Sequence, residues 1–148
     1  MIIAGQGPDR ERLEALIAEL AVTDTVTLAG FLPNPYALLA RANPFVLLCR
    51  WEGFALALAE AVILKAPAIA DGPAGPSEIL ASGQFGDLVT VDDVAALTRA
   101  ITRDLREPER LKQAAIAGSA HVRASFDANH AAARHLDILR DLVRKPAA

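Results

Sequence analysis

Two acidic residues interrupt the most apolar part of this 148-residue sequence. Glu52 and Glu60 lie eight positions apart, and most of the residues around them are apolar. A carboxylate in a segment that should be buried is costly unless it accepts hydrogen bonds. Neutral hydroxyls are suitable donors to it, whereas a phosphate would repel it. The pair therefore indicates a site that binds a hydroxyl-rich group, such as a ribose or a sugar beside a diphosphate.

The expected secondary structure places both acids around the start of a helix. We predict a strand at 44–48 and a helix at 55–64, so Glu52 falls at the carboxyl end of a parallel strand, where ligands of open α/β sheets bind. The N–H groups of Ala55 to Leu58 would lack helical partners and could hold a diphosphate. Glu60 would lean back toward this helix start. A nucleotide sugar has both the diphosphate and the hydroxyls that this arrangement requires.

A simpler explanation of the same pair requires no ligand. Glu52 would be a solvated loop residue, and Glu60 would form an ion pair with a nearby cation such as Lys65. Isolated glutamates at this spacing are more often explained in this way. The surrounding sequence decides between the two explanations.

The wider pattern is that of an α/β protein, because short apolar runs alternate with segments of helical period. We predict one domain over residues 1–144, with a frayed tail at 145–148. After residue 92 the pattern is wholly helical. Predicted strands are 1–4, 25–29, 44–48, 67–70 and 88–91, and predicted helices are 8–21, 36–41, 55–64, one from about residue 76, 94–105, 108–124 and 127–144.

Composition argues against several classes of partner. The net charge is −3 and no basic cluster interleaves with aromatic residues, so we expect no nucleic-acid partner. Cys49 is the single cysteine, and no His, Cys and Asp spacing resembles a metal site. No apolar run reaches the roughly 18 residues of a membrane-spanning helix. We expect a cytoplasmic chain without a metal or disulfide.

Further motifs accompany the two glutamates in a fixed order. They are 2–8 (IIAGQGP), 26–33 (VTLAGFLP), 52–54 (EGF), 60–61 (EA), Pro67, 75–80 (GPSEIL), Gly86 and 93–97 (DVAAL). This ordered set resembles the C-terminal, donor-binding domain of GT-B fold glycosyltransferases, in the retaining class marked by two glutamates separated by seven residues (the EX7E class, glycosyl transferases group 1). The resemblance extends over nearly the whole chain.

The resemblance implies a fold and an activity. The fold would be a Rossmann-like parallel sheet with flanking helices, which is the C-terminal half of a GT-B fold lacking its first strand and ending in three helices. The activity would be hexosyl or N-acetylhexosaminyl transfer from a nucleotide-diphosphate sugar to an acceptor hydroxyl, with retention and without a metal or other cofactor. Segment 75–80 is similar to members that build surface polysaccharides.

The same resemblance implies roles for individual residues. Glu52 would be the catalytic residue, hydrogen-bonding the sugar hydroxyls and supporting the reacting centre, and Glu60 would bind the ribose. Backbone N–H groups would contact the diphosphate, and the backbone of a loop in the first part of the chain would meet the base. The donor-binding residues are then Glu60, Gly53, Phe54, Ala55 and Leu56, together with Phe31, Leu32, Pro33 and Gly5.

The resemblance also implies missing parts. The acceptor-binding domain, and a first strand with an Arg and a Lys that clamp the diphosphate, would precede Met1. We therefore expect a separate acceptor-binding domain or chain, little or no activity of the chain alone, and a location in the cytoplasm or at the inner membrane face through that partner. Without the first strand, the predicted strands 1–4 and 44–48 would border a gap. They either pair directly or expose edges that favour self-association.

Two other functions fit the sequence. One is a non-catalytic remnant that binds a nucleotide or a protein partner. The other is half of an epimerase of the same fold.

Overall fold

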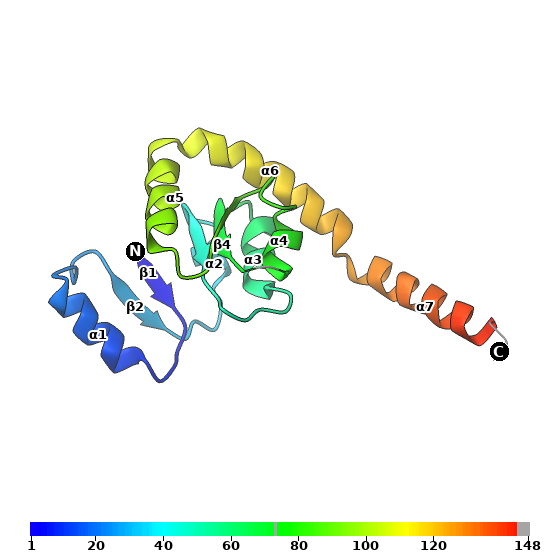
Figure 1. Ribbon diagram of the computed structural model, residues 1–148, viewed down its shortest axis with the longest axis horizontal. Coiled ribbons are helices and arrows are strands. Elements are labelled where there is room, and N and C mark those ends of the chain that lie inside the picture. The colour runs from blue at the N-terminus through cyan, green and yellow to red at the C-terminus, as the bar shows by residue number, and fades with distance from the viewer. Residues whose placement is uncertain (73, 145–148) are drawn as a thin grey trace. The chain divides into compact units, whose positions relative to one another are not determined.

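The computed structural model describes residues 1–72 and 74–144, so the predicted fraying of residues 145–148 lies outside it. The chain divides into two compact units, Met1–Pro35 (unit 1) and Tyr36–Ala148 (unit 2) (Figure 1). Each is described by itself, and the single domain at 1–144 stays a prediction.

Unit 1 contains two parallel strands and one helix. Strands β1 (Ile2–Ala4) and β2 (Thr27–Gly30) pair, and α1 (Arg10–Glu19) connects them. The helix is shorter than the predicted 8–21. Asp9 occupies the N-cap, so Pro8 lies in the preceding turn and not in the first helical turn, and Ala21 has left the helix with φ 53°.

Unit 2 contains a three-stranded parallel sheet of order β3-β4-β5. Every residue of the central strand β4 is buried, including the aspartate that ends it, as expected for a strand inside a parallel sheet. The strands are β3 (Phe45–Leu47), β4 (Ala68–Asp71) and β5 (Asp87–Val89), and the helices are α2 (Tyr36–Leu39), α3 (Leu56–Ile63), α4 (Gly75–Ile79), α5 (Val94–Arg106), α6 (Pro108–Ser125) and α7 (Ala128–Arg144).

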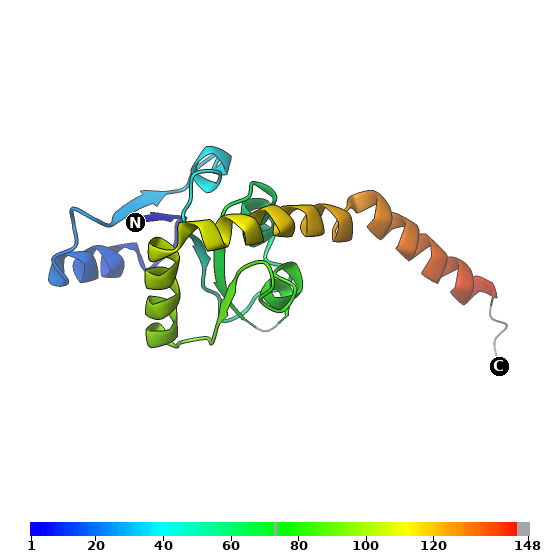
Figure 2. The same ribbon diagram turned by 90° about the horizontal axis from the view of Figure 1, so that it is seen from above.

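These elements confirm the predicted α/β class and its parallel strands. The five strands of the described residues lie within two residues of their predicted bounds, because each is a short, mostly apolar run near turn-forming residues. From residue 94 to residue 144 the chain forms three consecutive helices, as expected (Figure 1 and Figure 2). None of the helices among the described residues is long and apolar enough to cross a membrane.

The strands form two sheets, one in each unit. Within unit 1, β1 pairs with β2, and within unit 2, β3 pairs with β4. Whether β1 and β3 pair directly or expose edges that favour self-association stays a prediction.

Helix α3 is the centre of the core of unit 2. Leu58 and Val62 of α3 are buried with Ile79 and Leu80 in one cluster, which also contains residues of β4. Burial of one such side chain contributes about 1.5–3 kcal/mol. Helix α6 lies close along α3 because Gly118 has no Cβ, which would come within 3.2 Å of Val62 Cγ1. This packing fixes α3, and with it Glu60.

An ion-pair network fastens α5 and α6 to the start of β5. Arg110 donates to Asp104 at 2.7 Å and to Asp87 at 3.1 Å, and Arg103 also pairs with Asp87. The Asp104 side chain is fully buried. Burial, followed by the charge of Asp87, raises the pKa of Asp104 despite the opposing effect of Arg110.

The C-terminus of α3 predicts a stabilising substitution. Lys65 N–H donates to Val62 O and Ala66 N–H to Ala61 O, which is a Schellman motif, and Lys65 has φ 64°. Because this conformation is costly for a residue with a Cβ, Lys65→Gly should raise the free energy of unfolding by about 0.5–1 kcal/mol.

Urea denaturation measures this change. The matched control is Lys112→Gly, an exposed lysine inside α6, which should lower stability by about 1 kcal/mol. Equal destabilisation by both substitutions would show that Lys65 is not strained.

Candidate functional site

The loop that follows β3 leads directly into α3. Glu52 and Gly53 are exposed, and Phe54 is 40% exposed. Ala55 was predicted to be the first helical residue, but it is the N-cap, with a left-handed backbone (φ 64°, ψ 55°). This conformation turns the chain sharply, so that Glu52 stands in a loop before the first turn of α3.

The first turn of α3 offers fewer free donors than predicted. Leu58 N–H, which we expected to be free, donates to Ala55 O at 3.0 Å, because the N-cap carbonyl accepts the first bonds of the helix. The N–H groups of Leu56 and Ala57 remain beyond the reach of any helical carbonyl. Leu56 is 64% exposed, so the helix start is open to a ligand. The available donors can bind an anion, helped by the helix dipole.

Glu60 has a partner that the sequence did not indicate. The hydroxyl of Tyr36 donates to Glu60 Oε1 at 3.2 Å, across 24 positions of sequence. The predicted alternative, an ion pair of Glu60 with Lys65, is wrong, because no cation lies within ion-pair distance of Glu60 in the described part of the chain. The hydrogen bond and the charge of Glu60 raise the pKa of Tyr36. The partner of Glu60 is thus a neutral hydroxyl and not a cation.

The first residue of α4 contacts the loop between β3 and α3. A Cβ on Gly75 would lie 2.6 Å from Gly53 O and 2.9 Å from the Phe54 carbonyl carbon. Only glycine allows the first residue of α4 to lie this close. On another side, the Phe54 ring packs edge-on against Phe126 with 5.2 Å between ring centres. The loop between Glu52 and α3 is therefore held by contacts from two distant segments.

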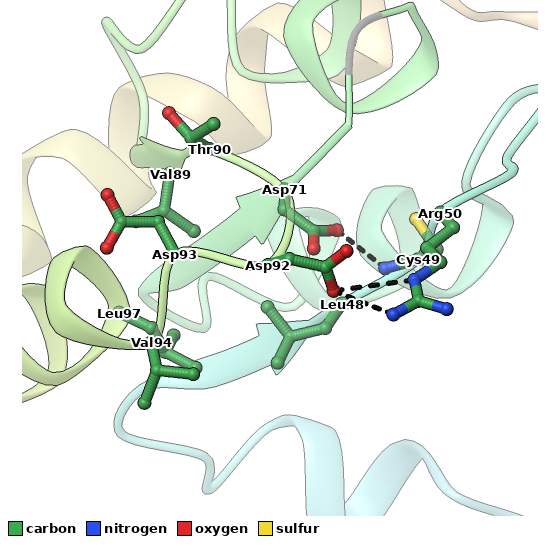
Figure 3. A pocket seen from close by; sticks show the side chains of 10 residues that line it. All are labelled: Leu48, Cys49, Arg50, Asp71, Val89, Thr90, Asp92, Asp93, Val94 and Leu97. Atoms are coloured by element: carbon green, nitrogen blue, oxygen red, sulfur yellow. Dashed lines mark hydrogen bonds and ion pairs between the residues drawn. The ribbon is translucent and has the colours of Figure 1, made fainter.

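A cavity of 260 Å³ opens at the carboxyl ends of all three strands of unit 2 (Figure 3). Asp71, the last residue of β4, is buried and accepts a hydrogen bond from Cys49 N–H at 2.5 Å. Arg50 forms an ion pair with Asp92 at 3.0 Å. Neither Asp71 nor Asp92 was predicted to be a site residue. A carboxylate that ends a wholly buried strand was the available signal for Asp71.

The pKa of the Cys49 thiol depends on the negative charges near the carboxyl ends of the strands. Burial, then the charges of Asp71 and Glu52, raise the pKa of Cys49, because each disfavours the thiolate. Asp71→Asn keeps an oxygen acceptor for Cys49 N–H but removes a negative charge. We therefore expect this substitution to lower the thiol pKa and to speed alkylation by iodoacetamide near pH 8.

Cys49 is the only cysteine, so the rate measured across pH belongs to one thiol. Asp137→Asn, an exposed substitution on α7, should leave the rate unchanged. A rate that stays the same or falls with Asp71→Asn would contradict the proposed role of the Asp71 charge.

The remaining predicted site residues belong to unit 1. Gly5 has φ 137° and its N–H donates to Gly30 O at 2.8 Å. Phe31 and Pro33 are exposed, and Leu32 is half-buried. Their joint role with Glu52 and Glu60, which belong to unit 2, stays a prediction.

No group of three or more His, Cys, Asp or Glu side chains among residues 1–72 and 74–144 is placed to hold a metal ion. The expectation of a reaction without a metal stays a prediction.

Comparison with known proteins finds related sequences among glycosyltransferases. The chain is 30% identical over 115 residues to N-acetylgalactosamine-N,N'-diacetylbacillosaminyl-diphospho-undecaprenol 4-alpha-N-acetylgalactosaminyltransferase of Campylobacter jejuni, covering 77% of this chain and 31% of that protein. It is 29% identical over 136 residues to the lipopolysaccharide core biosynthesis glycosyltransferase LpsD of Rhizobium meliloti, covering 92% of this chain and 40% of that protein. The chain thus spans less than half the length of these relatives.

Solved structures agree with the fold. Sucrose-phosphate synthase from Thermosynechococcus elongatus superposes with a TM-score of 0.83 at 28% identity, covering 96% of this chain and 38% of that one. HepE of Anabaena, solved with UDP-glucose, gives 0.84 at 20% identity, covering 95% of this chain and 40% of that one. Both likenesses support the C-terminal half of the GT-B fold. Since the family model for glycosyl transferases group 1 matches residues 1–121, the chain belongs to that family.

Proposed function

We propose that this chain binds a nucleotide-diphosphate sugar and holds it for transfer of the sugar to an acceptor hydroxyl, with retention of configuration. The observation that carries the proposal is the grouping at the start of α3. Along the chain, Glu52 precedes and Glu60 follows the first-turn N–H groups of Leu56 and Ala57, which are both exposed residues. Acceptors for hydroxyls thereby flank a donor site for a diphosphate, which matches the order of groups in a nucleotide sugar.

The proposed roles follow from this order. Glu60 accepts from the ribose, the N–H groups of the first turn of α3 bind the diphosphate, and Glu52 accepts from the sugar. Glu52 is exposed in a loop after β3, where it can reach a ligand at the carboxyl edge of the sheet. Gly53 lets the ligand approach the backbone, since a Cβ there would meet nothing within 4 Å.

The chemistry needs little more than fixed dipoles. In an oxocarbenium-like transition state the departing diphosphate gains negative charge. Preorganised N–H groups stabilise that charge, and one such donor contributes about 2.7–4 kcal/mol in a well-studied hydrolase. The proposal therefore requires no metal ion at this site, and the carboxylate of Glu52 would stabilise positive charge developing on the sugar.

Other parts of the active enzyme belong to the proposal as well. An acceptor-binding domain or chain completes the site, and Gly5 with the segment 31–33 contributes to donor binding. The sides of β1 and β3 that have no partner within their own unit are places where a further strand can pair, or where copies of the chain associate.

Calorimetric titration with uridine and guanosine diphosphate sugars tests the proposal. The wild-type chain should bind at least one of them, and Glu60→Ala should weaken that binding by about tenfold or more. Glu109→Ala, an exposed acid on α6, should leave the affinity unchanged. The absence of binding of every such sugar to the folded chain would refute the proposal.

A further inference from the structure

The position of Tyr36 beside Glu60 follows from how α2 packs on α3. Helix α2 has four residues, and its last, Leu39, is buried against Ala61 and Ala66. Ala61 is fully buried and has no side-chain atom beyond Cβ, so α2 can lie close to α3 at this point. Tyr36 lies one turn before Leu39, on the same face of α2. Its hydroxyl therefore reaches the residue that precedes Ala61, which is Glu60.

Tyr36 binds one oxygen of Glu60 and leaves the other available. The hydroxyl donates to Oε1 at 3.2 Å. In the described ranges 1–72 and 74–144, no hydrogen bond or ion pair to Oε2 is present. Glu60 is half-buried at the ligand edge of α3, so its second oxygen can still receive a donor from a bound molecule.

We propose that Tyr36 is a positioning residue, which holds Oε1 of Glu60 so that Oε2 accepts a hydrogen bond from a ribose hydroxyl of the donor. This inference rests on the proposed function, because it assigns Glu60 to the ribose. Tyr36 acts through Glu60 and need not touch the ligand. Tyr36, which lies outside segment 52–60, would thus help the protein to select ribose over deoxyribose.

The physical basis is the flexibility of a glutamate and the charge of its carboxylate. An unrestrained glutamate loses up to about 2 kcal/mol of side-chain entropy when it is ordered. A hydrogen bond already present in the free protein reduces the part of this cost that falls on ligand binding. A cation in place of Tyr36 would also hold the side chain, but it would offset the negative charge that makes Glu60 a strong acceptor.

The phenol suits this role at neutral pH. Glu60, through the hydrogen bond and then through its charge, raises the pKa of Tyr36 above its ordinary value of 10.0. The hydroxyl therefore stays protonated throughout the neutral range and donates continuously. Its distance of 3.2 Å is long for a bond between an O–H group and a carboxylate, so the contact can shorten when a ligand orders the site.

The first experiment tests the contact without a ligand. Tyr36 is the only tyrosine, so incorporation of 3-fluorotyrosine gives a single ¹⁹F NMR signal whose titration belongs to this phenol alone. Fluorination moves the titration closer to neutral pH, where the chain can be kept folded. Glu60→Gln should lower the pKa of the fluorophenol, while Glu109→Gln should not change it. Equal pKa values in wild type and Glu60→Gln would overturn the inference.

The second experiment tests the consequence for binding. Wild type should prefer UDP over 2′-deoxy-UDP or over 3′-deoxy-UDP, and Tyr36→Phe should reduce that preference by about fivefold. In a Glu60→Ala background, Tyr36→Phe should have no further effect, as expected for a residue that acts through Glu60. Thr98→Val, which removes a hydroxyl from α5, is the matched control.

The outcomes separate the two hypotheses. If wild type prefers UDP over at least one of the two deoxy analogues and Tyr36→Phe keeps that preference, the role of Tyr36 is refuted and the proposed function stands. If the folded wild type binds no nucleoside diphosphate or nucleotide sugar, the proposed function fails, and the assignment of Tyr36 fails with it. Thermal unfolding of each variant confirms that a change in affinity is not loss of the fold.

Discussion

Replacing Glu52 with alanine is expected to weaken the binding of a nucleotide sugar by about tenfold or more, while the affinity for the nucleoside diphosphate alone stays within about twofold. Glu52 is exposed in the loop before α3 and is proposed to accept hydrogen bonds from the sugar. A hydrogen bond to a charged group contributes about 1.5–3 kcal/mol, and only the sugar-bearing ligand would lose it.

Calorimetry with UDP-glucose and UDP, compared with GDP-mannose and GDP, measures this difference. Glu60→Ala is the informative comparison, because Glu60 is proposed to bind the ribose, and so its loss should weaken both ligands equally. If Glu52→Ala weakens the diphosphate as much as the sugar nucleotide, Glu52 does not contact the sugar. The division of roles between the two acids would then be wrong.

The second large effect is expected from Gly75→Ala, which should lower stability by about 1–3 kcal/mol and also weaken binding of the nucleotide sugar. The added Cβ would lie 2.6 Å from Gly53 O, so the backbone of α4 and the loop carrying Glu52 must separate. Both partners in this contact are backbone, and no flexible side chain can move aside.

Urea denaturation and the same calorimetric titration test this prediction. Gly7→Ala is the matched control, because the same change there meets nothing within 4 Å and Gly7 has no left-handed backbone. Unchanged stability and affinity in Gly75→Ala would show that the loop is not held by its contact with α4.

The elements of the sheet could be predicted because their signals are local. Strand β4, for example, consists of a short apolar run that follows a proline and is followed by an aspartate and a glycine, and this pattern needs no knowledge of distant residues. The predicted ends of helices were less accurate where an unusual backbone conformation determines the end. Nothing in the identity of Ala55 indicates a left-handed N-cap, because alanine favours a right-handed helix.

The contacts of the site could not be predicted because they are non-local. Tyr36 meets Glu60 only because Leu39 packs on Ala61, and Gly75 meets the loop at Gly53 only because α4 returns to it. Neither pairing has a sequence spacing that marks it. Glu60, by contrast, was identifiable as a residue that needs a partner, because it is a carboxylate in an apolar run. Glu52 is exposed, and its role stays a prediction.

The pairing partners of the strands also depend on long-range geometry. Within their own units, β1 pairs with β2 and β3 pairs with β4. Hydrogen bonding between parallel strands depends on how whole βαβ units pack, and strand sequences alone do not determine it. Whether β1 and β3 pair with each other stays a prediction.

The most direct test of the donor site is an NMR titration of the ¹⁵N-labelled chain with UDP-glucose, or with whichever nucleotide sugar binds in calorimetry. If the ligand lies where we propose, the largest shifts will be in the amides of Gly53, Leu56 and Ala57 and in the signals of Glu60. Shifts confined to the cavity at the end of β5, at Thr90, Asp92 and Val94, with an unchanged start of α3, would contradict this account.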